Sequence, residues 1–196
     1  MYKKQMTFQR IICFLSLVAS VLFFIYSLGM MTDLFDMLYS MIPDPDDLDS
    51  AKVAGAGIYY EMQGFNRTLL RCSIGMILLS CLLFLTNTHS RRKYYVGNYV
   101  SSLLNVAAEA GMAYWCHVQV AAYKAQYLST VDFAQLERRL SRYGTYTTST
   151  FWFDIHMAVC IIAILVAVLL IANLIWKKKV MTGEQALLRS GKVVSA

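Results

Sequence analysis

Four long apolar stretches separated by short polar segments dominate the pattern of hydrophobic and polar positions along this chain. At about 1.5 Å per helical residue, a stretch of about 20 residues crosses the roughly 30 Å hydrocarbon core of a bilayer. The pattern therefore predicts an all-α, polytopic membrane protein with four transmembrane helices in a bundle. The predicted spans cover about residues 11–31, 69–86, 95–123 and 153–176.

The composition agrees with this pattern and narrows the class of protein. Hydrophobic residues make up 58% of the chain and charged residues 15%, whereas soluble domains average about 45–50% and about 25%. This composition excludes a disordered chain and disfavours a water-soluble domain. The first apolar stretch is longer than the apolar region of a signal peptide, and no A-x-A cleavage site follows it, so we expect it to be retained.

Basic residues near the span ends predict the orientation of the helices. They precede the first span, fill the connection between the second and third, and follow the fourth: Lys3, Lys4, Arg10, Arg91, Arg92, Lys93, Lys177, Lys178 and Lys179. If every span crosses, all of them lie on one face, which the positive-inside rule places in the cytoplasm together with both termini. The net charge of +6 therefore reflects sidedness, and no nucleic-acid partner is expected. The four-helix membrane domain covers residues 1–179, and a short cytoplasmic tail covers residues 180–196.

The two outer loops, residues 32–68 and 124–152, are predicted to form a small, partly helical extracytoplasmic cap. The apolar residues of segment 33–42 share one helical face, so this segment is either an interfacial helix or a continuation of the first span. Segment 132–143 has apolar residues at helical spacing and predicts an amphipathic helix capped by Asp132.

The third predicted span is the least apolar and contains Glu109, which lies near the expected bilayer centre. A charge at that depth costs about 2.5–3.5 kcal/mol on insertion scales, so the side chain must face protein or water, or be protonated. A continuous stripe at spacings of three and four runs along this helix: Asn98, Ser102, Asn105, Glu109, Met112, Cys116, Gln119 and Tyr123. The intramembrane polar residues of this stripe are Asn98, Ser102, Asn105, Glu109 and Gln119. Two interpretations stay open: a proton or cation site, or a protonated Glu109 bonded to a neighbouring helix or subunit.

A second polar cluster is predicted near the outer ends of the second, third and fourth spans. It contains Arg71, His117, Asp154 and His156. Arg71 either extends outward to the interface or pairs with Asp154. Two histidines at similar depth on adjacent helices could ligate haem or a metal, but two ligands without a further carboxylate at fixed spacing do not define such a site. We therefore predict no cofactor and no metal.

Catalytic signatures do not occur in this sequence. There is no G-x-S-x-G, H-E-x-x-H or C-x-x-C motif and no paired-carboxylate motif, so we do not expect an enzyme. All five cysteines lie within the predicted spans, and none lies in an outer loop that could carry a disulfide framework.

Two stretches, Thr88–Tyr99 (THSRRKYYVGNY) and Phe151–His156 (FWFDIH), resemble uncharacterised four-span bacterial membrane proteins that accompany sugar-type ABC transporter permeases. The resemblance covers most of the chain and implies a location in the bacterial cytoplasmic membrane. Its motifs have no assigned chemistry, so no functional residue is carried over.

Three functional hypotheses follow. The first is a non-enzymatic integral membrane accessory subunit of a larger complex, most plausibly a transporter, with the lipid bilayer and permease-like subunits or further copies of the chain as partners. The alternative is a small proton- or cation-coupled homo-oligomeric transporter that uses Glu109. The second alternative is a haem or metal membrane protein that uses His117 and His156.

Overall fold

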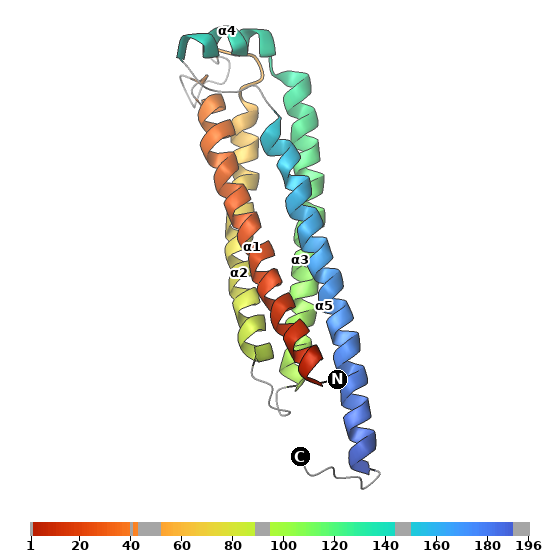
Figure 1. The fold of residues 1–196 in the computed structure, drawn as a ribbon. Coiled ribbons are helices and arrows are strands. Elements are labelled where there is room, and N and C mark those ends of the chain that lie inside the picture. The colour runs from red at the N-terminus through yellow and green to blue at the C-terminus, as the bar shows by residue number, and fades with distance from the viewer. Residues whose placement is uncertain (1, 40, 43–51, 89–94, 144–149, 190–196) are drawn as a thin grey trace. The chain divides into compact units, whose positions relative to one another are not determined.

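The protein folds as a set of α-helices. The computed structural model describes residues 2–39, 41–42, 52–88, 95–143 and 150–189. Within these ranges it contains five helices and no strand (Figure 1): α1 (Tyr2–Tyr39), α2 (Ile58–Thr88), α3 (Tyr95–Thr130), α4 (Phe133–Tyr143) and α5 (Phe151–Arg189). The all-α prediction is confirmed.

Three of these helices are long and apolar enough to cross a membrane. The qualifying segments are Lys3–Met30 in α1, Ile58–Asn87 in α2 and Phe151–Ala186 in α5. They identify the chain as a helical integral membrane protein, because apolar helices of this length have their backbone hydrogen bonds satisfied within lipid. Helix α3 has 36 residues, but its polar residues keep it outside this group.

Each long helix extends beyond the span that the sequence predicts. Helix α1 continues without a break to Tyr39, so residues 33–39 continue the first span and do not form a separate interfacial helix. Leu38 is fully buried at this end, and Met41 and Ile42 are buried directly after it.

The chain divides into two compact units, and each long helix contributes one segment to each of them. Unit 1 comprises Met1–Ser20, Met76–Gly111 and Ala163–Ala196. Unit 2 comprises Val21–Gly75 and Met112–Ile162, and therefore contains the whole of α4.

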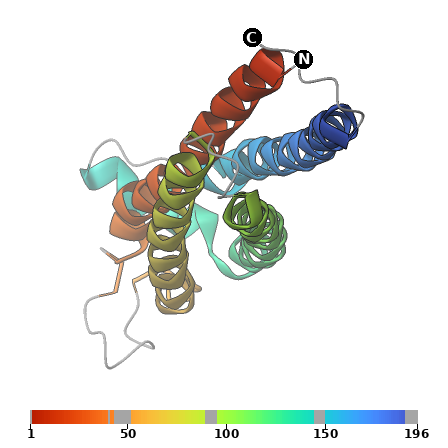
Figure 2. The same cartoon turned by 90° about the horizontal axis from the view of Figure 1, so that it is seen from below.

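Unit 1 has a small apolar core and a polar interior beside it. The core residues come from α1, α2 and α5: Ile12, Cys13, Ala19, Leu83, Val166 and Leu170. The rings of Phe8 on α1 and Trp176 on α5 pack with centroids 5.4 Å apart. Figure 2 shows these segments from below, with the first turns of α1 in red and the last turns of α5 in blue. Outward-facing residues such as Phe14 and Val168 are apolar and more than half exposed, as expected for a surface in contact with lipid.

Unit 2 has a core of large side chains. Phe23 on α1, Met62 on α2 and Phe153 on α5 are fully buried. Tyr127 on α3 lies between two aromatic rings, with centroid distances of 5.2 Å to Phe133 and 5.2 Å to Phe153. These contacts connect the end of α3 with the starts of α4 and α5.

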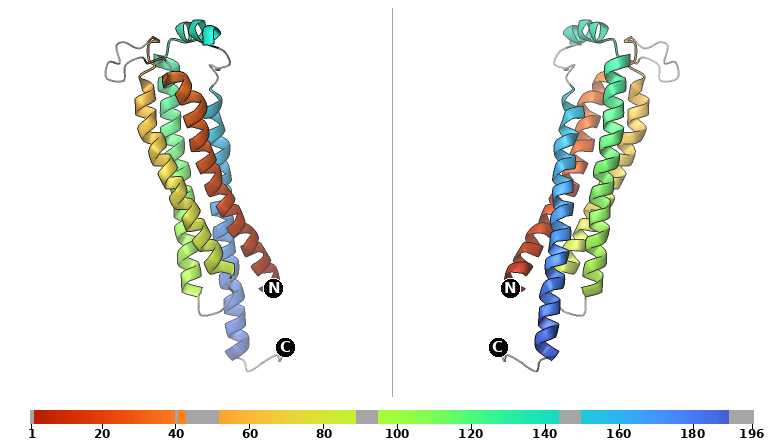
Figure 3. Two further views of the ribbon diagram at one scale, coloured as in Figure 1. Left: turned by 90° about the vertical axis from the view of Figure 1, so that its left-hand side faces the viewer. Right: turned by 90° about the vertical axis from the view of Figure 1, so that its right-hand side faces the viewer.

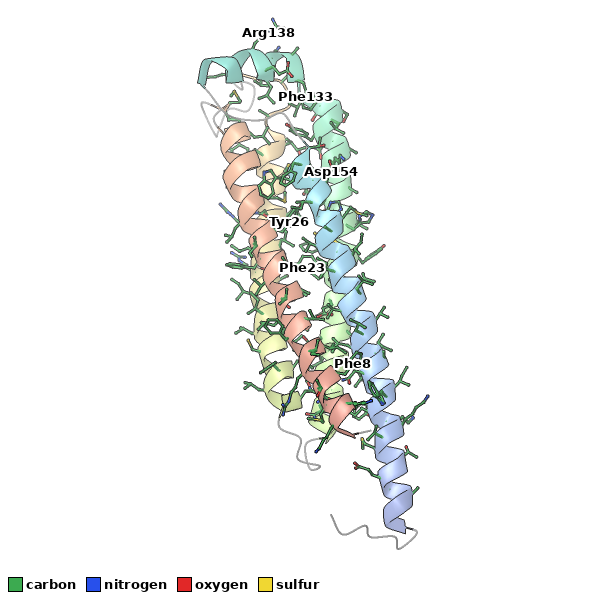
Figure 4. All side chains as sticks on the ribbon, in the orientation of Figure 1. Phe8, Phe23, Tyr26, Phe133, Arg138 and Asp154 are labelled. Atoms are coloured by element: carbon green, nitrogen blue, oxygen red, sulfur yellow. The ribbon has the colours of Figure 1, made fainter. Side chains whose placement is uncertain are left out.

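Helix α4 runs crosswise to the α3 segment of unit 2, as both views in Figure 3 show. The predicted amphipathic helix is present: it begins at Phe133, and the Gln135 N–H donates to Asp132 Oδ1 at 3.0 Å as an N-cap. Leu136 is fully buried, whereas Arg138 is exposed and points away from the helices below it (Figure 4). The side chain of Leu140 lies outside the described residues.

Candidate functional site: a buried polar cluster around Glu109

Small polar side chains from three helices meet inside unit 1 around Glu109. Ser16 and Ser20 come from α1, Ser80 comes from α2, and Asn105 and Glu109 come from α3. All five are buried, with exposed fractions of 1% or less. Serine is short enough to let helix backbones approach closely in a membrane, which brings its hydroxyl to the neighbouring helix. We call these five residues the Glu109 cluster.

Hydrogen bonds connect the three helices through this cluster. Ser16 Oγ donates to Glu109 Oε1 at 2.5 Å. The Ser80 hydroxyl donates to Asn105 Oδ1 at 3.1 Å, and its oxygen lies 2.9 Å from Ser20 Oγ and 3.2 Å from Ser16 Oγ. The Glu109 carboxyl is therefore bonded to another helix of the same chain.

The second carboxyl oxygen of Glu109 is not satisfied. Glu109 Oε2 is buried and has no hydrogen-bond partner within the described part of the chain. An ionised carboxylate can accept about four hydrogen bonds, and the described residues give it one, from Ser16. Burying a charge with so few donors is costly, so this arrangement suits a neutral carboxyl or one that shares a bound cation.

A second group of polar side chains in unit 1 continues from this cluster along the helices. Its members, which we call the inner polar line, are buried or half-buried: Gln5 and Gln9 on α1, Thr86 and Asn87 on α2, Ser101 on α3 and Asn173 on α5. The Asn105 Nδ2 donates to the Ser101 carbonyl at 2.8 Å. The inner polar line and the Glu109 cluster therefore share a hydrogen-bonded connection.

The structure separates the predicted polar stripe of α3 into two groups. Asn98, Ser102, Asn105 and Glu109 are buried in unit 1, with exposed fractions from 1% to 4%. Ser102 Oγ donates to the Asn98 carbonyl of its own helix at 2.7 Å. Gln119 belongs to unit 2 and is half-buried.

The sequence did not predict the serines of the Glu109 cluster on α1 and α2, which are Ser16, Ser20 and Ser80. Isolated serines in an apolar helix usually only fill space. A signal was nevertheless present in α1. Gln5, Gln9, Ser16 and Ser20 recur at spacings of four and seven, which places them on one helical face. All four are buried in the structure.

The predicted outer cluster lies in unit 2, where the two histidines contact each other. His117 Nδ1 lies 3.1 Å from His156 Nε2, and the rings are stacked with centroids 5.4 Å apart. The other ring nitrogen of His156 contacts the Phe153 carbonyl. The contact between the two imidazoles is a hydrogen bond.

Asp154, the acidic residue of this cluster, does not pair with Arg71 as considered from the sequence. Asp154 forms an ion pair with Lys124 of α3 and also accepts a hydrogen bond from Thr150 Oγ1 at 2.8 Å. Arg71 is exposed on α2 and makes no ion pair with Asp154. The Asp154 carboxylate is largely exposed, so this pair contributes little to stability.

The chemistry available at the two clusters differs. The Glu109 cluster presents carboxyl, hydroxyl and amide oxygens, which suit a proton or a hard cation. Across the described residues, no group of three or more His, Cys, Asp or Glu side chains is placed to hold a metal ion. Neither a protein-family model, nor a curated protein, nor a solved structure matches this chain.

Proposed function

We propose that this chain is a small proton- or cation-coupled membrane transporter in which Glu109 is the ion-binding residue. The observation that carries this proposal is the buried Glu109 Oε2 atom, which lacks a partner among the described residues. A buried polar atom of this kind requires an explanation, such as an exchangeable ion or water. Acids within membrane helices are costly and often lie on ion pathways.

The proposal includes a fourth membrane span, formed by α3. Val100, Leu103 and Leu104 on this helix are apolar and about half exposed. Its costly polar residues, Asn105 and Glu109, face inward and are 1% exposed. A helix of 36 residues is about 54 Å long, more than a span requires. The basic clusters then place both termini in the cytoplasm, and the resemblance to bacterial proteins favours the bacterial cytoplasmic membrane.

The hydrogen bonds of Glu109 suggest how ion binding is coupled to helix movement. With a proton bound, the carboxyl is neutral, and its Oε1 accepts the bond from Ser16. Release of the proton leaves a buried charge with a single donor, which is unfavourable until a cation or water reaches Oε2. Because the donor lies on another helix, the protonation state of Glu109 affects the contact between α1 and α3. Two packings with different affinities for the ion are what a coupled transporter requires.

The test is ion flux in vesicles that contain the purified full chain. A pH-sensitive dye inside the vesicles reports the response to an imposed pH step, with and without a sodium gradient. We expect Glu109→Gln to abolish the flux while the protein still folds, because the amide retains a hydrogen-bonding oxygen near Ser16. The matched control is Glu137→Gln, which makes the same change at an exposed position of α4. Flux through Glu109→Gln equal to that of the unchanged protein would refute the proposal.

A second candidate function, an accessory subunit of a transporter complex, is favoured by the exposed face of α3. Ala107 and Gly111 lie one turn apart on this face and are exposed, and a Cβ atom at Gly111 would meet nothing within 4 Å. Small residues one turn apart allow a neighbouring membrane helix to approach closely. The resemblance to proteins that accompany sugar-type permeases points to such a subunit as the neighbour.

Affinity purification in mild detergent followed by mass spectrometry separates the two candidates. Stoichiometric permease subunits support the accessory function, and their loss in Gly111→Leu places the contact on α3. Gly64→Leu is the control, because Gly64 is equally open on α2. Purification of this chain alone, or only with copies of itself, favours the Glu109 transporter.

A further inference from the structure

We infer that the ion bound at Glu109 enters and leaves unit 1 through the inner polar line. The line leads to the end of unit 1 where α1 begins, α2 ends and α3 begins. The inference rests on the proposed function and adds the route by which a proton reaches the site. In the proposed topology this end faces the cytoplasm.

The first part of the route runs between α1, α5 and α2. Gln5 Nε2 donates to Asn173 Oδ1 at 3.0 Å and to Gln9 Oε1 at 3.0 Å. Gln9 Nε2 then donates to the carbonyl of Asn87 at 2.6 Å. Gln5, Gln9, Asn87 and Asn173 are at most 2% exposed, so these amides provide polar groups in an interior that would otherwise be apolar.

The second part of the route runs from α2 along α3 to the carboxyl of Glu109. Asn87 Nδ2 donates to Ser101 Oγ at 3.3 Å, and the Ser101 carbonyl accepts from Asn105 Nδ2 at 2.8 Å. Asn105 Oδ1 accepts from Ser80 at 3.1 Å. The Ser80 hydroxyl lies 3.2 Å from Ser16 Oγ, which contacts Glu109.

A separate observation points to water or an ion along this route. Asn87 Oδ1 is buried and has no partner among the described residues, like Oε2 of Glu109. Both parts of the route therefore contain an acceptor that the described side chains leave unsatisfied. Buried polar atoms in such positions commonly bind ordered water. The amides and backbone carbonyls of the route do not pass a proton on themselves, so their role is to hold the water along which the proton moves.

Unit 2 also buries unsatisfied polar atoms, on Tyr26, Asn66 and Tyr127, but among its described residues no side-chain hydrogen bonds join these atoms into a line. Its buried polar side chains on α1 and α2 bond to nearby backbone carbonyls: Ser27 donates to Phe24, Ser73 to Leu70, and Asn66 to Ser27. The buried residues that follow Ser20 on α1 and Glu109 on α3 include Phe23 and Met112, which are apolar. This asymmetry assigns the exchange route to unit 1.

The described part of unit 1 buries or half-buries five titratable side chains besides Glu109. They are Cys13 on α1, Cys81 on α2, Tyr99 on α3, and Lys177 and Glu184 on α5. In the described part of unit 1, the carboxyl of Glu109 is bonded to Ser16 and to none of these.

Infrared spectroscopy of the reconstituted full chain tests the route. The carbonyl band of protonated Glu109, identified by its loss in Glu109→Gln, shifts when its proton exchanges for deuterium. We expect Asn87→Leu to slow this exchange about tenfold, which corresponds to the loss of about one hydrogen bond along the route. Ser101→Ala is a smaller change on the same route, and we expect it to slow exchange in the same direction even where Asn87→Leu impairs folding.

The matched control is Asn66→Leu, which replaces an equally buried asparagine in unit 2. We expect it to leave the exchange rate unchanged. Slowing by Asn66→Leu together with unchanged exchange in Ser101→Ala would overturn the inferred route. This outcome is distinct from failure of the proposed function, because the exchange rate is measured without transport. Flux that is lost in Glu109→Gln, with exchange unaffected by Ser101→Ala, would refute the route and retain the function.

Discussion

At the scale of single residues, two positions depend on atoms from distant parts of the chain. Glu109 has a donor on α1 for one carboxyl oxygen and an unsatisfied second oxygen. Gly55 has a φ of 80°, in the left-handed region that favours glycine. A Cβ atom there would lie 2.2 Å from the Thr130 carbonyl oxygen and 2.8 Å from the Val131 nitrogen. The absence of a side chain at Gly55 therefore lets the turn before α2 contact the end of α3.

We predict that Gly55→Ala destabilises the protein by about 2 kcal/mol or more, because backbone strain and a clash with backbone atoms add together. Thermal unfolding in detergent measures the effect. Gly64→Ala is the control: it lies within α2 with nothing within 4 Å, so the greater helix propensity of alanine should leave stability unchanged or slightly higher. Equal unfolding temperatures for the two variants would contradict this description of the turn.

At the scale of secondary-structure elements, α4 shows how a short helix is held in place. Its N-cap Asp132 also donates its backbone N–H to the Ala54 carbonyl at 3.1 Å, which connects α4 to the turn before α2. Leu136 is the fully buried apolar residue one turn into the helix. An isolated helix of 11 residues is marginal in water, so these tertiary contacts supply most of its stability.

We predict that Leu136→Asp detaches α4 from unit 2 and destabilises the protein by several kcal/mol, because it buries a charge without a partner. Ala134→Asp places the same charge at an exposed position of the same helix and should have little effect. Limited proteolysis together with thermal unfolding measures both. Similar protection of the two variants would mean that α4 is not held through Leu136.

At the scale of the whole molecule, the distribution of charge and of apolar surface determines how the chain inserts. Buried positions in unit 1 include many polar residues, whereas exposed positions on α1, α3 and α5 are occupied by residues such as Phe14, Leu103 and Leu165. This pattern reverses the one in soluble proteins because lipid, unlike water, offers polar side chains no hydrogen bonds. It supports insertion of unit 1 with its polar groups inside.

The proposed topology predicts which positions are accessible from outside an intact cell. Cysteine introduced by Asp47→Cys or Ser141→Cys should react with an impermeant maleimide, because the outer loops contain these positions. Ser90→Cys, in the connection between α2 and α3, should react only after the membrane is permeabilised. The unsubstituted chain controls for labelling of the native cysteines. Labelling of Ser90→Cys in intact cells, with Asp47→Cys unreactive, would invert the topology.

Local features of the sequence predicted the helices well. Apolar patterning located α1, α2, α3 and α5 along the chain, although among the described helices α3 is not apolar enough to qualify as a membrane span. Apolar spacing with an N-cap identified α4. Both signals depend on residues close together along the chain. The ends of the long helices were less predictable. Helix α1 extends past its apolar segment to Tyr39, because a helix continues through polar residues until a breaker or a tertiary contact ends it.

The sequence by itself determined that this chain is a helical membrane protein and that Glu109 needs a partner. The free-energy cost of exposing an acid to lipid follows from the residue type and its depth in the span, and both can be read from the sequence. Only the tertiary structure decided that the partner is Ser16 and that Lys124 pairs with Asp154. The physical reason is that helical periodicity fixes which residues share a face, whereas the rotation and packing of the helices decide which faces meet. Hydrogen bonds between helices depend on that second choice, since side-chain bonds extend only about 3 Å.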